Sequence, residues 1–167
     1  MSNASNHNFL KFFSGHLDRI YCGKQHLATS LPALADIAGF NNLKLAIMEL
    51  HQDVIKQINR MDQIYRLLNL QHNKAICIGM NTLLQEMFDG INEHNGEKPL
   101  SDLSLIFYLQ NIESIESASF QVLKLTAKGL DRPDVIQLLR ENFDEATEDR
   151  GLLLQIGEQF LSLHQVA

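Results

Sequence analysis

Two glutamates, Glu113 and Glu116, interrupt a strongly apolar stretch that runs from Ser101 to Gly129. This stretch reads as one long helix with apolar residues almost all round, which is typical of a helix packed on several sides. Steps of three and four residues define one face that holds both acids: Ile106, Leu109, Glu113, Glu116, Phe120, Leu123 and Ala127. A buried carboxylate needs a metal, a cation or a hydrogen-bonding partner. The two glutamates are therefore the first candidates for chemistry.

Three other predicted long helices each place a polar residue near the middle of their apolar face, namely Lys24, Gln57 and Arg150. Polar groups at one level of four helices are the layout of a carboxylate-bridged metal site. Such a site also uses Glu-x-x-His, and the sequence contains no Glu-x-x-His and no Asp-x-x-His. Two of the positions are cations, which would repel a divalent metal. The pattern therefore weakens the metal interpretation.

Three interpretations of the two glutamates stay open. They pair with Lys24 or Arg150 in the core, which is the favoured interpretation. They bind a metal together with Asp53 and with Glu145. In the third interpretation, the helix is rotated so that both acids lie at the edge of the core. A second apolar face then points inward: Leu105, Tyr108, Ile112, Ile115, Ser119 and Val122.

The elements that must position these residues are all helical, because helical periodicity recurs and no strand-like alternation appears. We expect a helix from near Phe9 that Pro32 bends or interrupts, then helices over about 43–70, 76–91, 101–129 and 133–163. The short helix 76–91 lies in the connection between the second and third long helices. Inward faces with steps of three and four predict an all-α, ferritin-like four-helix bundle. Residues 1–8 are expected to be a flexible tail and residues 9–164 a single domain.

The composition and net charge disfavour several classes of function. The 167 residues, 45% hydrophobic and 20% charged, suit one globular domain with a substantial core. A net charge of −6 with scattered Lys and Arg disfavours nucleic acid as a partner. We expect no contact with a membrane, because no apolar run reaches about 18 residues. The start of the chain lacks the pattern of a signal peptide, which predicts a cytoplasmic protein.

The spacing of the cysteines and histidines gives little evidence for a metal site. Cys22 and Cys77 form no CxxC motif and lie in apolar helical stretches, so buried free thiols are expected. A regulatory disulfide is the alternative, although it would be unusual in a reducing cytosol. His72 and two other histidines lie in the tail or in polar breaks, and the remaining four are off the polar positions. We expect no histidine to be a metal ligand.

The short helix has more apolar residues than one face can bury: Met80, Leu83, Leu84, Met87 and Phe88. This excess predicts that the helix either caps the bundle or forms a twofold dimer interface.

Several segments between Phe9 and Leu163 together resemble the YciE/YciF family of ferritin-like bacterial proteins, which have a poorly defined, stress-related role. The matching segments are IYCGKQHLATSLPALADIA at 20–38, QINRMDQIYRLL at 57–68, CIGMNTLLQE at 77–86, QNIESIESASF at 110–120 and LLRENFDEATEDRGLL at 138–153. The resemblance implies a ferritin-like bundle that often dimerises and carries a two-metal site.

Carried over position by position, the implied metal site is incomplete. The acid of the first helix falls at Lys24, and the second helix offers Asp53 and Gln57. The third helix keeps both of its glutamates. The acids of the last helix fall at Ala146 and Arg150, unless that helix is shifted by one residue, which would recruit Glu145 and Asp149 as alternative ligands.

We therefore predict a non-catalytic, dimeric, stress-associated structural protein with a degraded di-metal site and no cofactor, in which core cations replace the metals. The alternative is a di-iron or di-manganese carboxylate protein with oxidase or peroxide-scavenging activity, which would use an altered ligand set: Glu113, Glu116, Asp53 and Gln57.

Overall fold

The computed structural model describes residues 3–94 and 96–164, with side chains from His7 onward. Its described part is helical: α1 (Asn3–Ile37), α2 (Asn41–Leu67), the short 3-10 helix η1 (Lys74–Ile76), α3 (Ile78–Asn92), α4 (Lys98–Gly129) and α5 (Pro133–His164). The predicted all-α, ferritin-like architecture is confirmed. None of the described helices is long and apolar enough to span a lipid bilayer.

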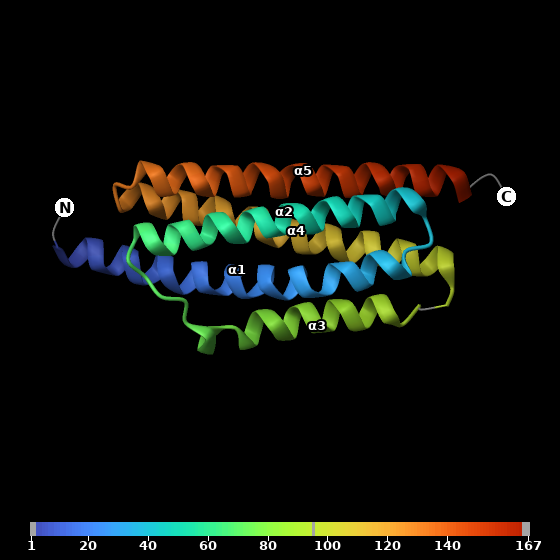
Figure 1. Cartoon of the computed structure of the whole chain (residues 1–167), viewed down its shortest axis with the longest axis horizontal. Helices are drawn as coiled ribbons and strands as arrows, with labels where there is room; N and C mark the ends of the chain where they lie inside the picture. Colours follow the sequence, from blue (N-terminus) through green and yellow to red (C-terminus); the bar gives the residue numbers. More distant parts are fainter. Residues whose placement is uncertain (1–2, 95, 165–167) are drawn as a thin grey trace.

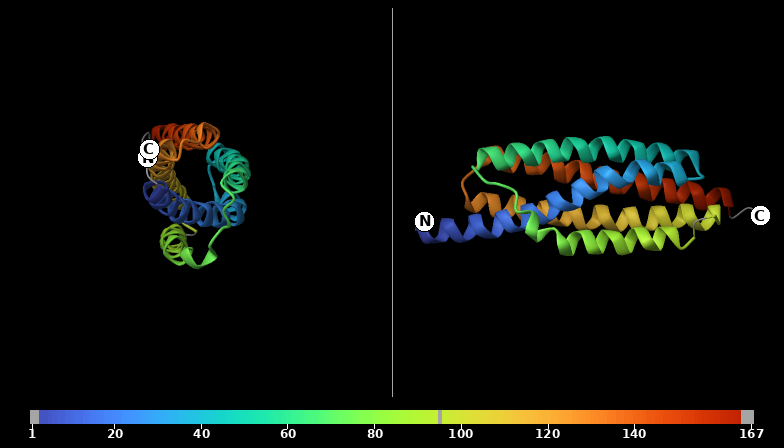
Figure 2. Two further views of the ribbon diagram at one scale, coloured as in Figure 1. Left: turned by 90° about the vertical axis from the view of Figure 1, so that its left-hand side faces the viewer. Right: turned by 60° about the horizontal axis from the view of Figure 1, so that its bottom comes forward.

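Four long helices form the bundle, and each lies beside two others in the order α1, α2, α5, α4 (Figure 1). All neighbouring pairs are antiparallel (Figure 2). The helix α3 lies outside this ring, against α1 and α4, and returns the chain to the end where α4 begins. This single long crossover is the connectivity of ferritin-like folds.

The helix boundaries differ from the sequence expectation mainly at the amino terminus. Helix α1 begins at Asn3, earlier than the expected start near Phe9, whereas residues 1–2 of the expected tail lie outside the described residues. Pro32 lies within α1, and the helix continues to Ile37 without interruption.

Side chains from distant parts of the chain form hydrogen bonds with the backbone at both ends of the bundle. The buried Asp102 near the start of α4 accepts hydrogen bonds from the backbone N–H groups of Gly39 (2.8 Å) and Phe40 (2.9 Å) at the start of α2. Arg132 between α4 and α5 donates to the carbonyl of Leu67 at the end of α2 (2.7 Å). Because buried backbone groups need partners, these contacts fix the two ends of the bundle.

Helix α3 packs closely on the bundle through small residues. Gly90 has no side chain, and the ring of Tyr108 from α4 occupies the space that a Cβ atom would need. Leu84 and Phe88 of α3 are buried, whereas Ile78 remains 75% exposed. The helix therefore buries one face along the side of α1 and α4 and does not cap an end of the bundle.

A disulfide links Cys22 of α1 to Cys77 at the start of α3, with 5.4 Å between the Cα atoms. This differs from the expected free thiols. Helical periodicity predicts that each cysteine lies on a helix, but only the packing of the loop between α2 and α3 brings the two together.

Candidate functional site: a polar layer in the bundle core

Five polar residues meet at mid-height of the bundle, and we call them the core polar cluster: Lys24 of α1, Gln57 of α2, Glu113 and Glu116 of α4, and Asp149 of α5. Each is at most 5% exposed. One hydrophobic cluster lies on each side of this layer along the bundle axis. The helices position these side chains because each helix continues its apolar inward face through the polar residue.

Lys24 provides the cation of the cluster. Its fully buried ammonium group forms an ion pair with Glu116 and lies 3.9 Å from the Oε1 atom of Glu113. Burial alone would lower the pKa of Lys24, but the charges of Glu113 and Glu116 outweigh it, and the pKa is raised above its ordinary value. Lys24 is therefore charged at neutral pH.

The two glutamates differ in their contact with Lys24. Burial raises the pKa of Glu113 well above its ordinary value, against the opposing effect of Lys24. Burial also raises the pKa of Glu116, whose carboxylate is the one in direct contact with the ammonium group. Lys24 contacts Glu116 directly and lies 3.9 Å from Glu113, so the pKa of Glu113 is raised further than that of Glu116.

Gln57 and Asp149 complete the layer with few partners. The side-chain amide of Gln57 and the Oδ2 atom of Asp149 have no hydrogen-bond partner among the residues that the structure describes. Burial, reinforced by the charge of Asp53, raises the pKa of Asp149 to about 7. Such unsatisfied groups in a core are uncommon, which makes this layer the candidate functional site.

The prediction for α4 is confirmed and the prediction for Arg150 is wrong. All seven residues of the predicted inward face of α4 are buried, and the rotated alternative leaves Ile115 and Val122 exposed. Arg150 is exposed, and Asp149 takes its place on the inward face of α5. Both positions satisfy the same periodicity, because they lie three and four residues after the buried Ala146.

Two further predicted ligands lie outside the cluster. Asp53 forms an ion pair with Lys56 on the same helix, with 2.6 Å between the Nζ and Oδ1 atoms. Glu145 accepts two hydrogen bonds from the guanidinium of Arg60, each 2.6 Å long. The structure therefore brings together Gln57, Glu113 and Glu116 of the first predicted set, with Asp149 of the alternative set.

Sequence reasoning missed Arg60. Its guanidinium also contacts Glu141 (2.9 Å) and the side chain of Asn142 (3.2 Å), and we call these residues the Arg60 cluster: Arg60, Glu141, Asn142 and Glu145. Asn142 in turn donates to the backbone carbonyl of Gln57 (3.4 Å), which joins the two clusters. The sequence places Glu141 and Glu145 four residues apart, which puts both acids on one face of a helix. Only the packing of α2 on α5 shows that Arg60 lies against them.

The core polar cluster does not fit the pair of metal ions that the fold implies. The ammonium group of Lys24 occupies the space between Glu113 and Glu116, where a bridging metal would need both carboxylates. Asp53 and Glu145 already pair with cations. The donor set is therefore short of carboxylates and contains a buried positive charge.

Four antiparallel helices with one long crossover and inward carboxylates at mid-height define the class of ferritin-like bundles. Within this class, the chain belongs to the family described as "Domain of unknown function (DUF892)", whose profile matches residues 8–164. The resemblance to the YciE/YciF family is thereby confirmed.

Two solved structures are similar over nearly the whole chain. The E. coli stress protein YciF is 24% identical, with a TM-score of 0.85, over 92% of this chain and 97% of that chain. YcfI from Rhodopseudomonas palustris, provisionally described as a structural protein, is 23% identical, with a TM-score of 0.80, over 87% and 92% of the two chains. A comparison with curated proteins finds no match.

Proposed function

We propose that this protein is a non-catalytic, stress-associated structural protein in which Lys24 replaces the metals of a ferritin-like site. One observation carries the proposal: a fully buried ammonium group lies against Glu116 and 3.9 Å from Glu113. A permanent cation keeps an inward carboxylate ionised with no metal, and it repels divalent cations. The descriptions of YciF as a stress protein and of YcfI as a structural protein agree with such a role.

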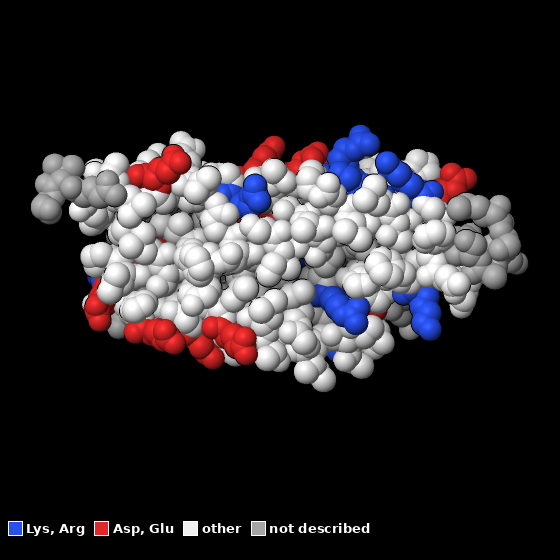
Figure 3. Space-filling view, turned by 180° about the vertical axis from the view of Figure 1, so that it is seen from behind, with Lys and Arg blue, Asp and Glu red and all other residues white. Residues whose placement is uncertain are grey.

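We further propose that the protein acts as a homodimer through the outer face of α4. Phe107, Ile115 and Val122 lie on one side of this helix and are 61%, 36% and 48% exposed. Figure 3 shows the side on which α4 lies: a broad middle band without Lys, Arg, Asp or Glu, with charged side chains along its upper and lower borders. An apolar face of this kind is typical of an interface between subunits.

Elemental analysis of protein purified without chelator tests the metal part of the proposal. We expect far less than one equivalent of iron or manganese. The matched variants are Lys24→Glu, which would add a carboxylate to the cluster, and Arg150→Glu, which adds one on the surface. Binding of added Mn²⁺ should appear with Lys24→Glu alone. Stoichiometric metal in the wild type that is lost in Glu113→Ala would overturn the proposal and favour the di-metal alternative.

Light scattering tests the dimer. Val122→Glu places a charge in the apolar face of α4 and should shift the mass from dimer to monomer. Lys128→Glu changes the charge elsewhere on the same helix and should leave the mass unchanged. A wild-type monomer at micromolar concentration would refute the dimer without affecting the assignment of Lys24.

A further inference from the structure

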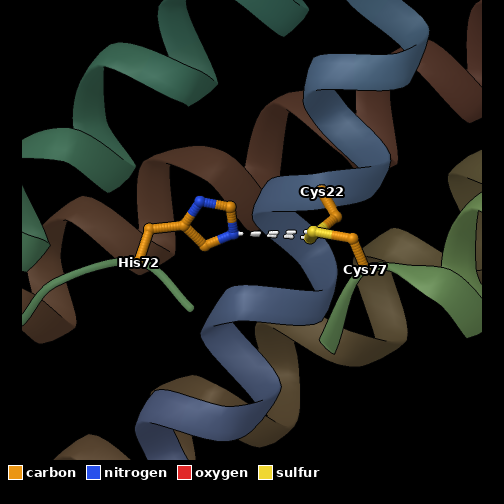
Figure 4. A group of neighbouring side chains, drawn as sticks. All are labelled: Cys22, His72 and Cys77. Carbon is orange, nitrogen blue, oxygen red and sulfur yellow. Dashed lines mark hydrogen bonds between the residues drawn. A yellow bond between two sulfur atoms is a disulfide. The ribbon is translucent and has the colours of Figure 1, made fainter. Parts of the chain in front are cut away.

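A second cluster of reactive side chains lies partly buried where α3 meets α1, outside the core polar cluster. Cys22, His72 and Cys77 converge there from α1, the loop after α2 and the start of α3 (Figure 4). The Nε2 atom of His72 lies 3.3 Å from the sulfur of Cys22 and 3.8 Å from the sulfur of Cys77. One imidazole nitrogen thus faces both sulfur atoms.

The surroundings hold the imidazole in this orientation. The rings of Tyr21 and Tyr65 pack against His72, with centroids 4.7 Å and 6.0 Å away. The buried Asp18 anchors the loop by accepting hydrogen bonds from the hydroxyl of Tyr65 (2.7 Å) and from the backbone N–H of Asn73 (3.3 Å). A ligand held by packing and hydrogen bonds needs little reorganisation on binding.

The site is open on one side. Cys22 is only 3% exposed, whereas His72 and Cys77 are partly exposed. His72 and Cys77 are therefore the ligands through which a metal ion from solvent would reach the site.

The spacing of the ligand atoms fits tetrahedral zinc. Zn–S bonds of about 2.3 Å and Zn–N bonds of about 2.0–2.1 Å place a nitrogen about 3.6 Å from each sulfur on the same ion. The two observed distances, 3.3 Å and 3.8 Å, lie on either side of this value. Two thiolates on one zinc lie about 3.8 Å apart, against about 2.0 Å in a disulfide. The two sulfur atoms therefore have to move apart when the site forms, by rotation of the cysteine side chains.

We propose that the reduced protein binds one Zn²⁺ through Cys22, His72 and Cys77, and that the Cys22–Cys77 disulfide is the oxidised, metal-free form. Binding forms two Zn–S bonds and one Zn–N bond and releases the two thiol protons, and a water fills the fourth position. A hydroperoxide releases the metal by oxidising the two thiolates, and it is itself reduced to an alcohol and water. The two thiolates lose two electrons and form the S–S bond, the O–O bond breaks with uptake of two protons, and Zn²⁺ leaves.

The soft sulfur ligands make this site selective for zinc, and the core polar cluster contains no such ligands. Thiolate and imidazole suit zinc, whereas iron and manganese in ferritin-like bundles are bound by carboxylates. The two proposals therefore concern different residues and different metals, and one can fail without the other.

Titration of the reduced, anaerobic protein with Co²⁺, followed by Zn²⁺, tests the site. Co²⁺ reports thiolate coordination through an intense charge-transfer absorption, and Zn²⁺ should displace it at one equivalent. We expect Cys22→Ser, Cys77→Ser and His72→Ala each to weaken Co²⁺ binding at least tenfold. His94→Ala, in the loop after α3, is the matched histidine control and should bind like the wild type. Hydrogen peroxide should release the zinc as the disulfide forms.

A measurement on the wild type alone guards against variants that fold poorly. Zn²⁺ should protect both cysteines of the reduced protein from alkylation, as counted by mass spectrometry. Unprotected thiols, or the absence of charge-transfer absorption, would overturn the zinc site. Metal that binds equally to Cys22→Ser but is lost in Glu113→Ala would instead place it in the core, which contradicts the proposed function as well.

Discussion

The core polar cluster sets one cation against three acids, and the more exposed Arg60 cluster sets one cation against two. Lys24 is fully buried and its nearest partner, Glu116, is almost so. Arg60 and Glu145 keep 19% and 20% of their side chains exposed, and Glu141 keeps 42%. Water can therefore solvate the Arg60 cluster when one partner is removed, whereas it cannot reach the core polar cluster. The comparison indicates that burial, more than the number of ion pairs, sets the cost of losing a charge.

Removal of the buried cation should have the largest effect. Lys24→Met keeps the length of the side chain but leaves Glu116 without its partner, so the free energy of unfolding should fall by about 3–5 kcal/mol. Urea denaturation measures this change. Arg150→Met is the matched control on the surface and should change the stability by less than about 0.5 kcal/mol. Equal effects of the two substitutions would remove the distinction between buried and exposed cations.

The two glutamates should respond differently to loss of their charge. Glu116→Gln removes the partner of Lys24 and should cost about 2 kcal/mol. Glu113→Gln replaces an acid whose pKa is raised well above its ordinary value by a neutral amide of similar shape, and it should cost less than about 1 kcal/mol. In a double-mutant cycle, Lys24→Met should couple strongly to Glu116→Gln and weakly to Glu113→Gln. The reverse order would contradict the interpretation that Glu116 is the main partner of Lys24.

Asp149 should make the stability depend on pH. The pKa of its carboxyl is about 7 in the folded protein, above its ordinary value of 3.8. Between these values the folded state binds more protons than the unfolded state, so the stability from this group is complete at low pH and is lost as the pH rises to 7. Asp149→Asn abolishes this loss, and from pH 5 to 7 it should gain stability over the wild type, by at most about 1.4 kcal/mol per pH unit.

Chemical denaturation at several pH values measures this gain. Asp144→Asn makes the same change at an exposed position of α5, so the difference between the two variants isolates the effect of burial. Parallel pH profiles for the wild type and Asp149→Asn would refute the raised pKa.

Removal of the partly exposed Arg60 should have the smallest effect. Arg60→Met breaks the two-pronged contact with Glu145, but both remaining acids can be solvated, so the expected loss is about 1 kcal/mol. Added salt should reduce this loss, because exposed charges are screened, and should hardly change the effect of Lys24→Met. Urea denaturation at low and high sodium chloride distinguishes the two clusters. If Arg60→Met lowered the free energy of unfolding as much as Lys24→Met, burial of the cation would not determine the loss of stability.

The sequence by itself determined the helices, the ferritin-like class and the inward face of α4. The apolar residues of α4 repeat at steps of three and four around Glu113 and Glu116, and this helix is buried on the face that the repeat selects. The inward position of Lys24 follows from the same rule, because Leu17, Ile20, Leu27 and Leu31 continue its periodicity and are buried. Periodicity predicts that a polar residue points inward when apolar residues of the same helix face precede and follow it.

Only the tertiary structure decided which of two adjacent residues points inward on α5. A helix has 3.6 residues per turn, so positions three and four residues along share a face, and Asp149 and Arg150 are equivalent in a periodicity argument. The neighbouring Lys24 distinguishes them, because it attracts a carboxylate and would repel a guanidinium. Arg60, Cys22, His72 and Cys77 show the same limit: their partners lie on other elements, and contacts between distant elements depend on packing that no local pattern encodes.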